Sequence, residues 1–135
     1  MAIRIVRLGT PRAKDEGPRL GTVRRPPRGV RKEDYARLDY YDQWLPLLSP
    51  SQAVVSRAMS APWTDARWKA FVRAYRREMA EPAPRQMIEV LARLSHHTDF
   101  SLGCYCEDQS RCHRSVLRTL LKERGARLAP GAGGG

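Results

Sequence analysis

The two ends of this chain resemble β-strands, and helix-like segments fill the middle. Residues 2–8 alternate apolar and basic side chains, and residues 99–106 form an apolar segment that is typical of a buried strand. The predicted helices cover residues 51–60, 64–80, about 84–96 and 111–124. Strands separated by helices pair in parallel through crossover connections. This order therefore predicts an α/β domain with a small, largely parallel sheet of about three or four strands flanked by about four helices.

Local signals mark where these elements begin and end. Ser51 and Thr64 are typical helix N-caps, Pro84 fits a first helical turn, and Gly125 follows the last helix where a left-handed cap belongs. A second short strand is predicted at residues 20–25, because two prolines stop it there.

With 135 residues, the chain suits one domain with one core. We expect a single α/β domain over residues 1–128 and a flexible, glycine-rich tail at 129–135. Residues 26–50 are rich in proline and aromatic side chains. Such a segment is typical either of the lining of a ligand cleft or of a loop packed over the core, and the sequence leaves both interpretations open.

Charge and cysteine content limit the function classes. The net charge is +11, and residues 1–37 hold 11 of the 25 basic side chains but only 4 of the 14 acidic ones. A basic surface of this kind favours phosphate-bearing partners. The apolar runs fall short of the roughly 18 residues of a membrane span. Three cysteines do not suit a disulfide framework, so we expect a reducing cytoplasm and no membrane partner.

All three cysteines lie within nine residues. Cys104 and Cys106 end the predicted strand, and Cys112 opens the next helix together with His113 and Arg114. Ligands of parallel α/β sheets bind at the carboxyl ends of strands, and a helix N-terminus attracts anions. A thiol in such a place has a lowered pKa and is more reactive.

Three hypotheses follow for this segment. In the first, it binds an anion and carries a nucleophilic thiol. The candidate catalytic residues are then Cys106, Cys112 and His113, and the candidate anion-binding residues are Arg28, Arg111 and Arg114. In the second, Cys104, Cys106, Cys112 and His113 hold zinc or iron. Adjacent Cys112 and His113 point about 100° apart on a helix, which disfavours a shared ion. In the third, Cys104 is a packing residue only.

Four motifs carry a resemblance to a known family. They are Pro27-Arg28-Gly29-Val30 with Lys32, the segment Trp44-Leu45-Pro46-Leu47-Leu48-Ser49-Pro50-Ser51, Trp68 with Phe71 and Tyr75, and Cys112-His113-Arg114-Ser115-Val116-Leu117. Together they resemble the proteins grouped as domain of unknown function 488, from about Ile3 to Arg124.

The resemblance implies a small α/β domain whose biochemical activity is not established. The family's first block usually reads Asp-Arg-Leu-Trp-Pro-Arg-Gly, whereas residues 23–29 here lack the Asp and the Trp. Other branches lack cysteines at the positions of Cys104 and Cys106. An activity common to the family therefore fits an anion pocket built from Arg28, His113 and Arg114.

These observations predict a protein that binds an anionic, phosphate-bearing ligand at the Cys-His-Arg junction. The pocket is expected between residues 106–114 and the basic, aromatic loop at 24–44. The first alternative is a non-catalytic DNA- or RNA-binding module that uses the basic residues 1–37. The second alternative is a small zinc or iron protein that depends on the cysteines.

Overall fold

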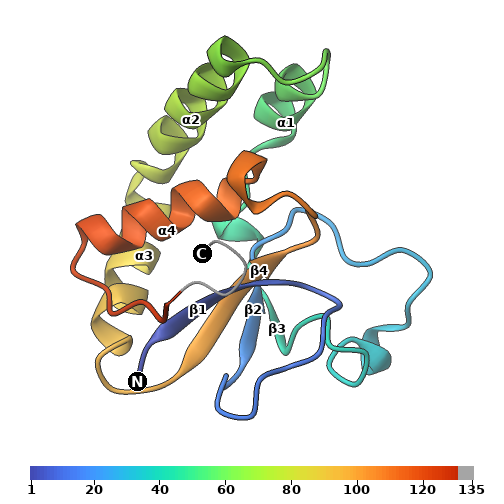
Figure 1. The fold of residues 1–135 in the computed structure, drawn as a ribbon, viewed down its shortest axis with the longest axis vertical. Helices are drawn as coiled ribbons and strands as arrows, with labels where there is room; N and C mark the ends of the chain where they lie inside the picture. Colours follow the sequence, from blue (N-terminus) through green and yellow to red (C-terminus); the bar gives the residue numbers. More distant parts are fainter. Residues whose placement is uncertain (131–135) are drawn as a thin grey trace.

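The computed structural model describes residues 1–130 and contains four strands and four α-helices within them (Figure 1). The strands are β1 (Ile3–Arg7), β2 (Arg19–Gly21), β3 (Gln43–Trp44) and β4 (Phe100–Cys104). The helices are α1 (Gln52–Ala58), α2 (Asp65–Met79), α3 (Pro82–Leu94) and α4 (His113–Glu123). Short 3₁₀ turns cover Lys32–Asp34, Pro46–Leu48 and Gln109–Arg111. The predicted α/β class is confirmed.

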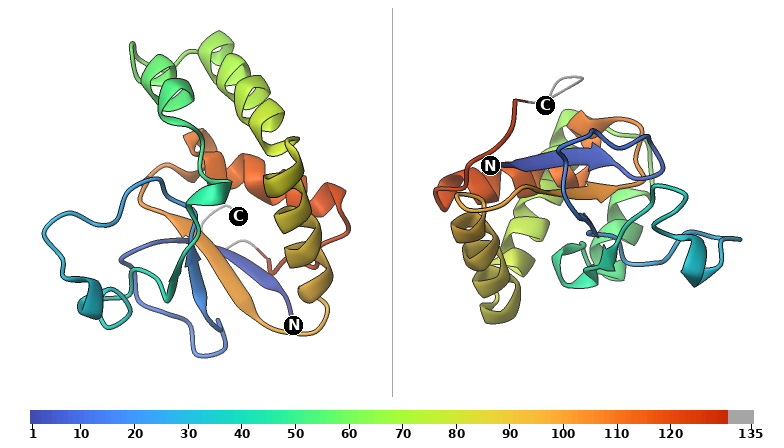
Figure 2. Two further views of the ribbon diagram at one scale, coloured as in Figure 1. Left: turned by 180° about the vertical axis from the view of Figure 1, so that it is seen from behind. Right: turned by 90° about the horizontal axis from the view of Figure 1, so that it is seen from below.

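All four strands run parallel, in the order β1-β4-β2-β3. β1 pairs with β4 over its whole length, from Ile3 opposite Phe100 to Arg7 opposite Cys104. Because the strands are parallel, their carboxyl ends share one edge of the sheet. α1 and α2 stand together beyond that edge (Figures 1 and 2), and the chain from β4 into α4 also turns there.

Two groups of buried apolar residues fill the interior. The larger lies among the sheet, α2, α3 and α4, and its fully buried members are Ile3, Leu48, Tyr75, Leu102, Leu117 and Leu121. The smaller group consists of Leu8, Val23, Tyr41, Cys104 and Cys112. Two of the three cysteines are therefore part of a packed core at the carboxyl edge of the sheet.

The predicted helix signals act as expected. The Ser51 hydroxyl accepts a hydrogen bond from the Val54 amide at 3.2 Å, and the Thr64 hydroxyl accepts one from the Arg67 amide at 3.1 Å. Gly125 adopts the left-handed conformation after α4, with φ of 82°. The amino ends of two helices and the carboxyl end of a third are thus determined locally.

Other boundaries differ from the prediction by a few residues. β4 ends at Cys104, so Cys106 belongs to the loop, and α4 begins at His113 because residues 109–111 form a 3₁₀ turn. α3 begins at Pro82, ahead of the predicted Pro84. β3 was not predicted, since its two residues are defined only by their pairing with β2.

Residues 131–135 of the predicted tail lie outside the described part of the chain. Its first residue, Ala129, donates a backbone hydrogen bond to Ile3 at 2.8 Å and so continues the pairing beside β1. Among residues 1–130, none of the helices combines the length and the apolar character needed to cross a bilayer.

Candidate functional site

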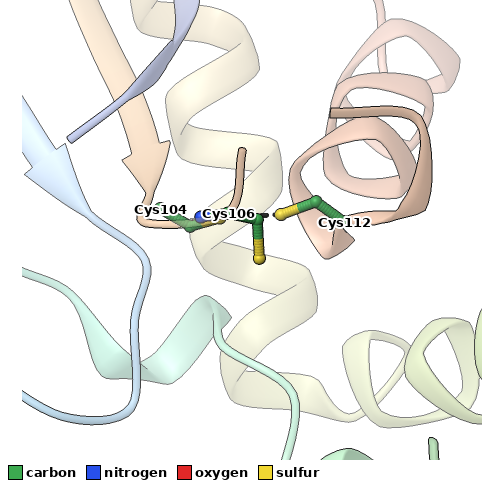
Figure 3. A group of neighbouring side chains, drawn as sticks. All are labelled: Cys104, Cys106 and Cys112. Carbon is green, nitrogen blue, oxygen red and sulfur yellow. Dashed lines mark hydrogen bonds between the residues drawn. The ribbon is translucent and has the colours of Figure 1, made fainter. Parts of the chain in front are cut away.

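The three cysteine sulfurs converge where β4 ends and α4 begins. Cys104 is the last residue of β4, Cys112 is the N-cap of α4, and Cys106 lies in the loop between them. Their Sγ atoms all lie within 4.8 Å of one another, and those of Cys104 and Cys112 are 2.7 Å apart (Figure 3). Cys104 and Cys112 are buried, whereas Cys106 is exposed. The group therefore presents one thiol to solvent and two to the core.

Backbone contacts hold Cys106 beside the other two cysteines. Its amide donates to Sγ of Cys104 at 3.4 Å, and its carbonyl accepts a hydrogen bond from Nη2 of Arg114 at 2.8 Å. Strand alternation does not apply at this position, because β4 has already ended. The loop geometry, and not the strand, brings the third sulfur into the group.

Arg114 ties three segments together from the first turn of α4. Its side chain is only 4% exposed. Nη1 donates to the carbonyl oxygens of Val6 at 3.1 Å and of Cys104 at 3.4 Å, and Nη2 reaches Cys106. Nε is buried and has no partner among the described residues. Arg114 therefore has a structural role, and its proposed contact with an anion stays a prediction.

His113 is buried beside Cys112 and is held in one tautomer. Its Nε2 lies 2.7 Å from the carbonyl oxygen of Thr22, and because a carbonyl only accepts, Nε2 must carry the proton. Nδ1 is then a free acceptor 3.9 Å from Sγ of Cys112. Burial lowers the pKa of His113 to about 4, so the ring is neutral near pH 7.

The pKa values of the three thiols are shifted in different directions. The neighbouring thiols of Cys104 and Cys112 lower the pKa of Cys106 against the opposing effect of burial, and the positive charge of Arg114 adds to the lowering. Hydrogen bonds among the same thiols, together with burial, raise the pKa of Cys104 and of Cys112. The arrangement thus favours one thiolate, on the exposed Cys106, supported by two protonated neighbours.

A known family model covers nearly the whole chain. The family model DUF488-N3a, described as the active DUF488-N3 subclade, matches residues 3–125. The chain belongs to the DUF488 family. The matched range covers this DUF488 chain from β1 to the end of α4 and includes every residue of the cysteine group. Neither a curated protein nor a solved structure matches it.

The other two predicted anion-binding residues of the DUF488 chain lie in different surroundings. Nη2 of Arg111 is 3.1 Å from a carboxylate oxygen of Asp65, and its guanidinium lies 5.6 Å from the centre of the Trp68 ring. Arg111 is thus bound to α2. Arg28 is exposed on the loop that follows β2. Their roles in anion binding stay predictions.

Tyrosines of the long loop cover the cysteine group. Tyr41 is buried with Cys104 and Cys112, and Tyr35 and Tyr40 pack against the same cluster at half-buried positions. Tyr105, from the loop after β4, packs there as well. Of the two interpretations of residues 26–50, packing over the core describes their tyrosines.

Two features of the DUF488 chain were not anticipated from its sequence. Thr22 orients His113, although nothing in a lone threonine after a strand signals this. Arg19 and Glu16 form a buried ion pair, with Nε of Arg19 2.5 Å from a Glu16 oxygen. Ser101 donates to the same carboxylate at 2.9 Å. Charges three residues apart in a polar loop are usually solvated, so the sequence carried no distinguishing signal.

Proposed function

We propose that this DUF488 protein uses Cys106 as a reactive thiolate toward an anionic, phosphate-bearing ligand at the junction of β4 and α4. The observation that carries the proposal is the unequal exposure of three adjacent thiols. Cys106 faces solvent, while the two cysteines that stabilise its negative charge are buried. A reactive thiol needs this combination of access and a stabilised anionic form.

The neighbouring residues have distinct parts in this proposal. Cys104 and Cys112 stabilise the Cys106 thiolate, and neutral His113 offers Nδ1 toward the Cys112 thiol. The guanidinium of Arg114 lies beside the loop, and Cys112 makes no side-chain cap to the first amides of α4. Those amides and that charge would favour a phosphate near the thiolate.

The test is the rate at which each cysteine is alkylated by iodoacetamide, followed by mass spectrometry of the peptides. An ordinary thiol reacts roughly 100-fold more slowly at about pH 6 than at about pH 8, because its thiolate fraction falls. Cys106 is expected to react first and at nearly the same rate at both values, while Cys104 and Cys112 react slowly.

Two variants make this test specific. Cys106→Ser should abolish the fast reaction, and Cys112→Ala should make the rate at Cys106 depend more strongly on pH, because the substitution removes one S–H donor beside the thiolate. Equal, slow reaction of all three cysteines in the wild-type protein would contradict the proposal.

Metal binding is a second candidate function, favoured by the closeness of the sulfurs. Three thiolates within 4.8 Å, with a backbone amide donating to one of them, suit zinc or iron(II) with one further ligand position. His113 is not part of the group whose ligand atoms all lie within 4.8 Å of one another, which consists of the three cysteines. Near-stoichiometric zinc or iron in tag-free protein, with all three thiols protected until chelation, would support this candidate over the free thiolate.

Location and partners follow from the same chemistry. An exposed thiolate oxidises readily outside a reducing compartment, so we propose that the protein acts in the cytoplasm.

The alternative of a nucleic-acid module stays a prediction. Several of its basic residues are already paired with carboxylates, as Arg12 is with Asp42 at 2.6 Å.

A further inference from the structure

A hollow of about 1090 Å³ runs beside β1, between that edge strand and the helices α2 and α4. The cysteines are not part of its wall. Five arginines besides the buried Arg19 contribute to the lining: Arg4, Arg7, Arg76, Arg114 and Arg118. Hydroxyl groups from Thr10, Ser110, Ser115 and Thr119 lie among them. Within residues 1–130, the carboxylates in the lining other than the partner of Arg19 are those of Glu107 and Asp108.

Two of these arginines, Arg4 and Arg7, form ion pairs that a ligand can replace. Arg4 lies 3.0 Å from Asp15, whose side chain is 76% exposed. Arg7 lies 3.5 Å from Glu107, whose side chain is 85% exposed. Ion pairs with such exposed carboxylates are weak, because water screens them. A phosphate group in the hollow would compete with them through charge-assisted hydrogen bonds.

A second observation points to a ligand independently of the surface charge. Arg114 is buried and lines this hollow, and its Nε is a buried donor without a partner among the described residues. A buried N–H group that lacks an acceptor is rare in folded proteins, and leaving it so is costly. The hydrogen-bond partners of Arg114 within residues 1–130 are carbonyls and not carboxylates, so an oxyanion bound in the hollow would supply the counter-charge that this buried guanidinium lacks.

We propose that this arginine-lined hollow binds a ligand that carries two or more phosphate groups. The ligand's oxygens would contact Arg114 and replace the exposed carboxylates at Arg4 and Arg7. The inference deepens the proposed function, because Arg114 also holds the carbonyl of Cys106 and thereby connects the hollow to the thiol. Binding of phosphate here does not require reaction at Cys106.

The experiment is calorimetric titration of the full chain with inorganic pyrophosphate at low salt. Substitution of Arg114 would disturb the fold, so the test variant is Arg7→Ala with Arg118→Ala. The matched control is Arg73→Ala with Arg77→Ala, which removes the same charge from exposed positions of α2 outside the hollow. We expect saturable binding at one site, weakened about tenfold or more in the test variant and within about twofold in the control.

Absence of saturable binding would overturn the proposal. Equal weakening in both variants would also overturn it, since binding would then depend only on the net charge of the protein. Competition then identifies the source of the phosphates. Displacement of pyrophosphate by ADP indicates a nucleotide, and displacement by an oligonucleotide without terminal phosphates indicates a nucleic-acid strand. Displacement by neither would mark generic attraction of small anions and overturn the proposal.

The Cys106→Ser variant separates this inference from the proposed thiol function. It should bind pyrophosphate as the wild-type protein does. If it binds while the wild-type thiol proves unreactive, the hollow stands and the thiol function fails. If pyrophosphate does not bind while Cys106 reacts rapidly at low pH, the thiol function stands and the phosphate-binding hollow fails.

Discussion

Arg114 places a full positive charge in the interior, and the cost of burying that charge is offset by three backbone carbonyls. We predict that Arg114→Met lowers the free energy of unfolding by roughly 2–3 kcal/mol, because the carbonyls of Val6 and Cys106 lose a charged donor. Urea unfolding measures this change. Arg118→Met, one turn later in α4 with a single 3.3 Å contact, should cost less than about 1 kcal/mol. Equal losses in the two variants would contradict this role.

Single residues also mark the limit of prediction from sequence. The placement of Cys112, His113 and Arg114 at the start of α4 could be predicted, because the apolar periodicity of the helix begins directly after them. The part played by Cys104 could not, since a buried cysteine at a strand end is usually only packing. Its role depends on Sγ of Cys112 lying 2.7 Å away, which only the tertiary fold brings about.

At the scale of elements, prediction succeeded where the signal is local. Helix caps at Ser51 and Thr64 are decided by the residues that make them, and both are confirmed. β3 consists of two residues whose only strand character is their pairing with β2, so no periodicity could reveal it. The end of β4 was placed two residues late because Tyr105 and Cys106 continue the apolar pattern into the loop.

Two glycines give an element-scale prediction, because both adopt positive φ but only one is crowded. A Cβ on Gly17 would lie 2.0 Å from the carbonyl oxygen of Asp99, where the loop before β2 passes the start of β4. A Cβ on Gly125, after α4, would have no atom of the described part of the chain within 4 Å.

We expect Gly125→Ala to cost about 1 kcal/mol, the price of the left-handed conformation. Gly17→Ala should cost at least about 3 kcal/mol, because backbone must also move. Urea midpoints of the two variants measure the difference. Equal losses of unfolding free energy in the two variants would show that the backbone before β2 shifts at little cost and does not position the sheet.

For the whole molecule, parallel topology explains why the site could be located before its contacts were known. The carboxyl ends of all four strands lie at one edge, so the loop after β4 and the first turn of α4 must meet there. The tyrosines of residues 26–50 then pack against one side of the cysteine group. The hollow along β1 could not be predicted, because its arginines come from β1, α2 and α4, which are distant in sequence.

The global fold should lose stability toward acid in two stages. Burial lowers the pKa of His113 to about 4, below the 6.5 of an unfolded histidine. Between pH 6.5 and 4 this histidine binds a proton in the unfolded chain but not in the folded chain. The free energy of unfolding therefore falls as the pH drops through this range. Burial opposes ionisation of Glu16, but hydrogen bonds from Arg19, Ala13 and Ser101 outweigh it and hold the pKa of Glu16 below its usual value of 4.5. That contribution is present above pH 4.5 and is lost as the pH falls through the folded pKa.

Urea unfolding across this pH range separates the two groups. His113→Gln keeps a donor for the Thr22 carbonyl and should make the loss of stability between pH 6.5 and 4 smaller than in the wild-type protein, where the lowered pKa of Cys106 also contributes. Glu16→Gln should lower stability near neutral pH, because it leaves the buried Arg19 without its counter-charge, and should flatten the dependence below pH 4.5. A wild-type profile that stays level down to pH 4 would contradict a neutral, buried His113.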